Sequence, residues 1–104
     1  MMSVKLIMNW DVKPDKDQDY FEFLVREWVP ATTGLSLQPI GAWFSVYQQD
    51  AAAPRMMTEV LADDLETMRD ILGSEGWERI QDKLMEYVDN YTHKVVHASG
   101  DFQL

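Results

Sequence analysis

The segment VKLIMNWDVKPDKDQDYFEFLVREWVP, residues 4 to 30, changes its apolar spacing half-way, and this change indicates the fold class. Residues 4 to 10 are short and apolar and are closed by Asp11 and Pro14, which is typical of a buried strand. After Pro14 the spacing becomes that of a helix, and Pro30 marks its end or a kink. The predicted buried face of this helix holds Phe21, Leu24, Val25 and Trp28.

The middle of the chain predicts a hairpin. Residues 31 to 39 contain glycine and proline and are expected to form a loop. Residues 40 to 49 are rich in aromatic and β-branched residues, which favours a second strand. A short turn then leads to a third strand at residues 56 to 62, and such a turn favours antiparallel pairing.

The last third of the chain predicts two helices and a fourth strand. Asp63 with Glu66 resembles a capping box that opens a short helix to Leu72. Ser74 caps a longer helix that runs to about Tyr91, and a strand follows it. The apolar stripe of the longer helix is Trp77, Ile80, Leu84 and Val88.

The element order is therefore β-α-β-β-α-β, which predicts one α+β domain over residues 1 to 104 with a ferredoxin-like fold. A four-stranded antiparallel sheet would carry its helices on one face. The other face has no helix, yet in the second strand neither Trp43 and Tyr47 nor the residues between them suit water. An apolar sheet face of this kind favours a homodimer in which the second copy covers it.

Composition excludes several classes of partner. The net charge of -9, with the lysines and arginines scattered singly, disfavours nucleic acid and anionic membrane surfaces. The first apolar run is too short for a signal peptide or a membrane span, so a cytoplasmic location is expected. The absence of cysteine leaves no disulfide framework or thiol nucleophile.

Together with this element order, the stretches REWVP, IGAWFSVY and LGSEGWERI resemble the dimeric alpha-beta barrel superfamily, in particular its NIPSNAP-type and antibiotic-biosynthesis-monooxygenase-like branches. The resemblance covers residues 4 to 99 and implies two ferredoxin-like chains packed sheet against sheet around a cavity. Members include cofactor-free monooxygenases that act on aromatic polyketides, haem-degrading monooxygenases, lactone isomerases and ligand-sensing domains. Function is therefore left open by the fold.

The haem-degrading members use an asparagine on the first strand, a tryptophan in the short helix and a histidine on the second long helix. Asn9 matches the first, but the short helix LETMRDILGS has no tryptophan. The segment WERIQDKLMEY has no histidine, and Gln81 or a neighbour stands in its place. Without an axial ligand haem is not expected, and no cofactor is predicted.

The cavity candidates follow from strand alternation. If Leu6 and Met8 pack on the helices, the residues between them point to the cavity. Two interpretations stay open for Trp43 and Tyr47, which either line a pocket or fill the dimer core. Two also stay open for Asn9, which either faces the cavity or ends the strand. The pocket candidates from the first three strands are Ile7, Asn9, Trp43, Tyr47, Met57 and Glu59.

Glu59 lies in the middle of a strand, where an unpaired carboxylate would be costly. It either faces the cavity as a base with a raised pKa or pairs with Lys5 on the neighbouring strand. The ion pair is the preferred interpretation, because structural pairs are commoner than catalytic ones.

His93 and His97 are the two histidines of the chain. The paired valines between them favour a strand, on which they share a face but stand about 13 Å apart, so they cannot hold one metal ion and no metal site is predicted. Either His97 faces the cavity beside Val95, or the histidines lie on the helix side or at the rim.

The functional hypothesis is a homodimer that binds a small apolar or aromatic molecule, with cofactor-free oxygenase or isomerase chemistry carried by Asn9, Glu59 and His97. Its rival is a non-catalytic ligand-binding or structural homodimer. The pocket candidates are the six residues named above from the first three strands and the two histidines, His93 and His97.

Overall fold

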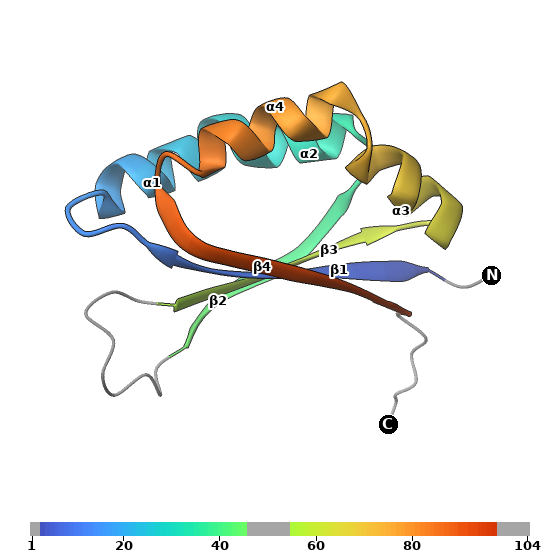
Figure 1. Ribbon diagram of the computed structural model, residues 1–104, viewed down its shortest axis with the longest axis horizontal. Helices are drawn as coiled ribbons and strands as arrows, with labels where there is room; N and C mark the ends of the chain where they lie inside the picture. Colours follow the sequence, from blue (N-terminus) through green and yellow to red (C-terminus); the bar gives the residue numbers. More distant parts are fainter. Residues whose placement is uncertain (1–2, 46–54, 98–104) are drawn as a thin grey trace.

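The computed structural model describes residues 3–45 and 55–97, and of these residues 42–45 and 55 are described by their backbone alone. Helices lie on one face of a twisted sheet, and none of the described elements covers the other face (Figure 1). In chain order the elements are β1 (Val4–Val12), α1 (Asp17–Phe23), the π-helix η1 (Leu24–Trp28), α2 (Val29–Gly34), β2 (Gln38–Ser45), β3 (Arg55–Ala62), α3 (Leu65–Leu72), α4 (Glu75–Leu84) and β4 (Val88–His97).

The four strands form one antiparallel sheet in the order β2-β3-β1-β4. This order and the helices on a single face confirm the α+β, ferredoxin-like prediction. Along β1 every second residue is buried against the helices, and Leu6 and Met8 are fully buried. The alternation of β1 therefore fixes which face of the sheet holds the core and which is open.

The first helical region differs from its prediction. It continues beyond Pro30 to Gly34, and its middle turn is the π-helix η1. A π turn takes more residues than an α turn, so it shifts the helical phase, and Phe21 and Val25 are exposed instead of buried. Pro30 does not end the helix, because the wide turn before it accommodates the missing N–H. The buried residues of α1 and η1 are Tyr20, Phe23 and Trp28.

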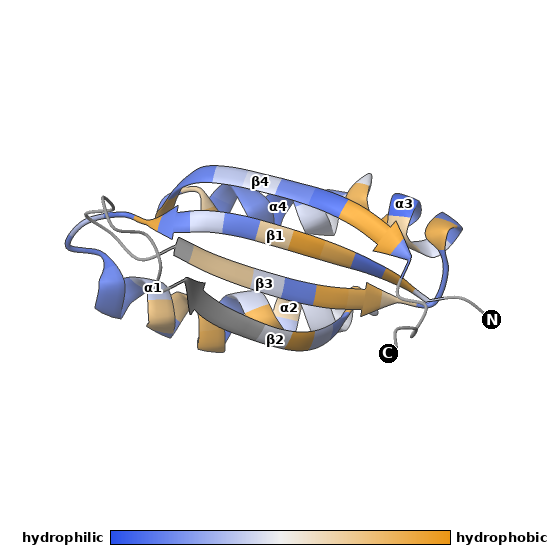
Figure 2. Ribbon diagram, turned by 90° about the horizontal axis from the view of Figure 1, so that it is seen from below, coloured by the Kyte–Doolittle hydropathy of each residue, from blue (hydrophilic) through white to orange (hydrophobic). Residues whose placement is uncertain are grey.

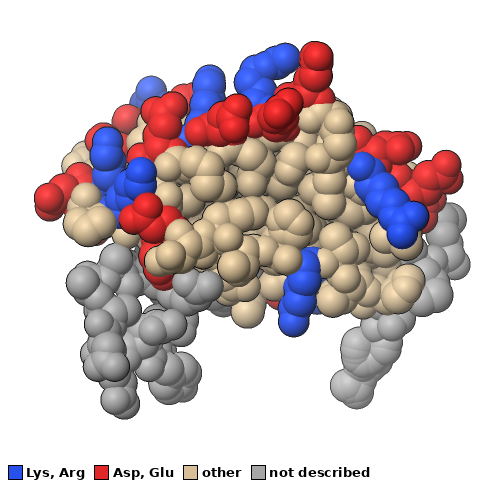
Figure 3. Space-filling model, viewed as in Figure 1, with Lys and Arg blue, Asp and Glu red and all other residues tan. Residues whose placement is uncertain are grey.

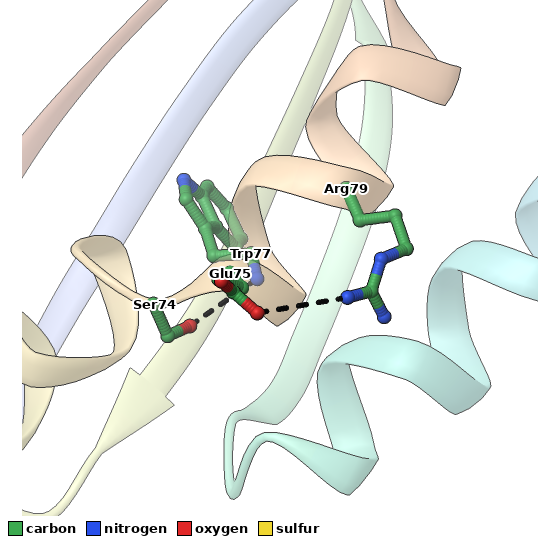
Figure 4. A network of polar contacts seen from close by, with 4 residues as sticks. All are labelled: Ser74, Glu75, Trp77 and Arg79. Carbon is green, nitrogen blue, oxygen red and sulfur yellow. Dashed lines mark hydrogen bonds and ion pairs between the residues drawn. The ribbon is translucent and has the colours of Figure 1, made fainter.

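Both later helices begin at a side-chain cap. Asp64, and not Asp63 as predicted, accepts the Thr67 N–H at 2.8 Å, and this bond lowers the pKa of the Asp64 carboxyl. Ser74 caps α4 as predicted, because its Oγ accepts the Trp77 N–H at 3.2 Å (Figure 4). In that view the ring of Trp77 and the side chain of Arg79 point to different sides of the helix.

Helix α4 ends at Leu84, seven residues before the predicted end near Tyr91. The Tyr87 N–H closes the turn on the Leu84 carbonyl at 2.9 Å, and the Tyr87 carbonyl accepts the Lys13 N–H at 2.9 Å. These bonds join the turn to the end of β1, so β4 begins at Val88, a buried residue of the predicted helical stripe. The other three stripe residues are buried in α4 as predicted.

Candidate functional site

Four of the predicted pocket residues meet on the open face of the sheet. The register of β1 and β3 sets Ile7 opposite Glu59 and Asn9 opposite Met57. All four alternate with buried residues, so they point away from the helices. Figure 2 shows the sheet from this side, with β1 and β3 at its centre and the helices behind. We call this group the open-face array: Ile7, Asn9, Met57 and Glu59.

Glu59 forms the ion pair that its sequence context favoured. Its Oε1 lies 3.3 Å from the Lys5 Nζ, and the two side chains are 15% and 29% exposed, respectively. Lys5 stands one pleat from Ile7, so the pair crosses diagonally between β1 and β3. The carboxylate is therefore already engaged by a cation on the same face.

Asn9 is half-buried between apolar neighbours. No hydrogen bond joins its amide to another side chain within residues 3–41 and 56–97. Met57 beside it is 37% exposed, which is unusual for a large apolar residue at the centre of a sheet. The array thus combines an apolar surface with one amide that has both donor and acceptor atoms available.

Of the two aromatic candidates, the structure describes the backbone of Trp43 alone. The register sets Trp43 opposite Met57, in the row of Asn9, but the side chain of Trp43 lies outside the described residues. Tyr47 also lies outside them. Their predicted roles stay predictions.

The histidines do not join the open-face array as pocket candidates, and of their two interpretations the structure favours the one on the helix side or at the rim. In the register of β4, His93 stands opposite Met8 and His97 opposite Val4, and both partners are buried under the helices. The histidines therefore share a face, as predicted, but it is the helix side of the sheet, where Val95 also lies. The alternative of a rim histidine bonded to a neighbour fits His93, whose Nδ1 lies 3.0 Å from the Tyr91 hydroxyl.

The sequence did not single out the buried aromatic cluster beneath the helices. The indole Nε1 of Trp10 donates to the Tyr20 hydroxyl at 2.9 Å, and its ring stacks on Tyr91 with centroids 6.0 Å apart. Burial raises the pKa of Tyr20 to about 12 despite the bond from Trp10. Burial likewise raises the pKa of Tyr91 to about 12, although a bond from Gln81 lowers it in part.

Three buried polar atoms on the helix side of the sheet have no partner among the described residues. They are the Nε1 of Trp28, the Oγ1 of Thr58 and the Oε1 of Gln81. Unpaired atoms of this kind are uncommon in protein cores and each costs stability. Trp10 follows Leu6 and Met8 on the buried face of β1, and this alternation is the signal that could have indicated its burial.

A separate groove of about 480 Å3 runs between α2 and α4. Its floor includes Leu35 and Ile80, and Lys83 crosses its rim to Glu27 at 2.8 Å, a contact that raises the pKa of Lys83. Charged side chains cover the helical layer, whereas the sheet side of the same view is mostly uncharged (Figure 3). In the described part of the chain no cluster of three or more metal-binding side chains occurs, and no helix there is long and apolar enough to cross a membrane.

Solved structures with the same architecture are numerous. A NIPSNAP family protein from Agrobacterium tumefaciens superposes with a TM-score of 0.68 at 10% identity, over 95% of this chain and 88% of that one. An antibiotic biosynthesis monooxygenase-like protein from Nitrosomonas europaea gives 0.65 at 9% identity, over 95% and 92%. An EthD family protein from Bacillus halodurans gives 0.63 at 18% identity, over 92% and 97%.

The chain shares its ferredoxin-like fold with these solved structures. No family model matches the chain, and no curated protein matches it. At identities of 9 to 18% the likeness to the solved structures concerns the fold alone, and activity has to be inferred from the side chains of this chain.

Proposed function

We propose that two copies of this chain pack open face on open face and bind a small apolar or aromatic compound between them. The observation that carries the proposal is the open-face array, in which the amide of Asn9, without a hydrogen-bond partner among the described side chains, lies between Ile7 and Met57. A pocket with apolar walls and a few polar groups suits a ligand with an aromatic body and one hydroxyl or carbonyl. The NIPSNAP and monooxygenase-like neighbours share the fold of the single chain, with the helices on one face of the sheet.

The array favours binding over proton transfer. Of its four side chains Glu59 alone can act as a base, and Lys5 already occupies it at 3.3 Å. Asn9 can orient a ligand and donate a hydrogen bond, but it cannot take up a proton.

Matched ligands separate the two parts of the proposed pocket. We expect 1-naphthol to bind more tightly than naphthalene in calorimetric titrations, because its hydroxyl reaches the amide of Asn9. Asn9→Leu keeps the branched shape of the side chain and removes the hydrogen bond, so it should weaken 1-naphthol binding about tenfold without weakening naphthalene binding. Met57→Asp should abolish binding of both ligands, because a charge on the open face prevents the second sheet from packing.

His93→Gln is the control, because His93 lies on the opposite face of the sheet. It should leave both affinities unchanged. The open-face pocket is refuted if neither ligand binds, or if Asn9→Leu weakens naphthalene as much as 1-naphthol.

A further inference from the structure

The first helical region carries an exposed apolar stripe on its outer side. Phe21 is 43% exposed, Val25 68% and Val29 36%, and the three residues are four positions apart. We call them the helix stripe. Apolar residues that are exposed singly are common on proteins, but three in one row form a continuous apolar surface.

The π-helix η1 keeps this row straight. An α turn takes about 3.6 residues, so side chains four apart drift steadily around an α-helix. The π turn takes more residues, and a spacing of four lies between the two kinds of turn. The row begins in α1, crosses η1 and ends at the start of α2. The line through its three side chains is therefore nearly parallel to the helix axis.

Two residues of opposite charge lie beside the helix stripe. Glu22 and Arg26 follow Phe21 and Val25 by one residue each, so they lie on the same flank. Their side chains are 62% and 75% exposed and only 3.8 Å apart within one chain. A pair this exposed contributes little by itself and is free to exchange partners.

A second copy in antiparallel orientation would match both the apolar row and the charged pair beside it. If a two-fold axis passes beside Val25, Phe21 of one copy meets Val29 of the other. The same rotation brings Glu22 of one copy near Arg26 of the other, because the flank faces its own image. A surface that matches its own image under a two-fold rotation is what an isologous interface requires.

The stripe does not compete with the open face. The helices lie behind the sheet when the open face is viewed, and α1 and α2 lie on the side of β2 (Figure 2). A dimer formed through the open faces would therefore leave both helix stripes available. Two different two-fold contacts in one assembly close into a tetramer when their axes cross at right angles.

We propose that the helix stripe binds the same stripe of a second copy in antiparallel orientation, as an interface separate from the open face. Three apolar side chains from each copy form a smaller interface than the interfaces of stable complexes. Association through the helix stripe therefore depends on concentration in the micromolar range. Val25 lies at its centre, where two copies of this side chain meet.

The test is the mass of the protein in solution, measured by light scattering over a range of micromolar concentrations. We expect the limiting mass of wild type to be halved by Val25→Asp, because two carboxylates would face each other across the axis. Glu22→Arg should weaken the association about tenfold or more, and adding Arg26→Glu should restore it by reversing the charges. Circular dichroism shows whether each variant is folded.

Leu65→Asp is the matched control. Leu65 is 38% exposed at the first position of α3, where an acidic residue suits the helix dipole, so its mass should equal that of wild type. The helix stripe interface is overturned if Val25→Asp has the mass of wild type, or if the double charge reversal associates no better than Glu22→Arg. A wild-type dimer that Val25→Asp converts to monomer supports the stripe and refutes the open-face dimer instead.

Discussion

Replacing Tyr20 by phenylalanine tests how the aromatic cluster is held. Trp10 and Tyr20 are both fully buried, and the indole N–H donates to the Tyr20 hydroxyl at 2.9 Å. Tyr20→Phe keeps the ring and removes the acceptor, which leaves a buried N–H unpaired. We expect the free energy of unfolding to fall by about 2 kcal/mol near pH 8.

The cost of this substitution should shrink at alkaline pH. The pKa of Tyr20 is raised from 10.0 to about 12 by burial. Below pH 10 the phenol is protonated in both states, and its contribution to stability is complete. Between pH 10 and 12 the unfolded chain loses the proton and the folded chain keeps it. The free energy of unfolding of wild type is therefore lower by about 1.4 kcal/mol at pH 11 than below pH 10.

Tyr20→Phe lacks this ionisation, so its cost relative to wild type should fall to roughly 0.6 kcal/mol at pH 11. Urea unfolding followed by circular dichroism at one protein concentration measures both values. Tyr87→Phe is the control, because the Tyr87 ring stacks on Phe23 and no hydrogen bond of its hydroxyl occurs among the described residues. Equal costs of Tyr20→Phe at the two pH values would refute the reasoning.

Three further predictions concern the helix cap, the ion pair and the backbone. Asp64→Ala should lower Tm by about 5 °C, whereas Asp63→Ala should change it by less than about 1 °C, because the carboxylate of Asp64 makes the cap; equal shifts in differential scanning calorimetry would contradict this. A double-mutant cycle on Lys5 and Glu59 should give a coupling above about 1.5 kcal/mol if a second sheet buries the pair and below about 1 kcal/mol if it stays at the surface, as measured by urea unfolding. Ser36→Gly should stabilise the chain by about 1 kcal/mol, since Ser36 has a φ of 72°, and a loss of stability would contradict this.

The elements that obey simple periodicity were predictable. In β1 the alternation is regular, so the sequence predicted that Ile7 and Asn9 lie on the face opposite Leu6 and Met8, and it left open which face carries the helices. It also predicted the partner of Glu59, because a mid-strand carboxylate needs a cation within reach on the next strand. These inferences depend on neighbouring residues and neighbouring strands.

The helix stripe and the histidine face were not predictable in the same way. The π turn adds residues to one helical turn and changes the phase of Phe21 and Val25, which no 3.6-residue pattern anticipates. The face of His93 depends on the early end of α4 and on an irregularity of register at Asn9 and Asp11. A shift of one residue turns every side chain of a strand to the other face, so such details decide the outcome.

The most direct test of the open-face dimer is native mass spectrometry of the Val25→Asp protein, in which association through the helix stripe is removed. We expect twice the chain mass of 12.1 kDa, with any retained small molecule visible as added mass on the dimer. Adding Met57→Asp, a substitution at an exposed position of the open face, should reduce the mass to that of one chain. A single chain mass for Val25→Asp alone, at micromolar concentration, would contradict the dimer and the binding site between its sheets.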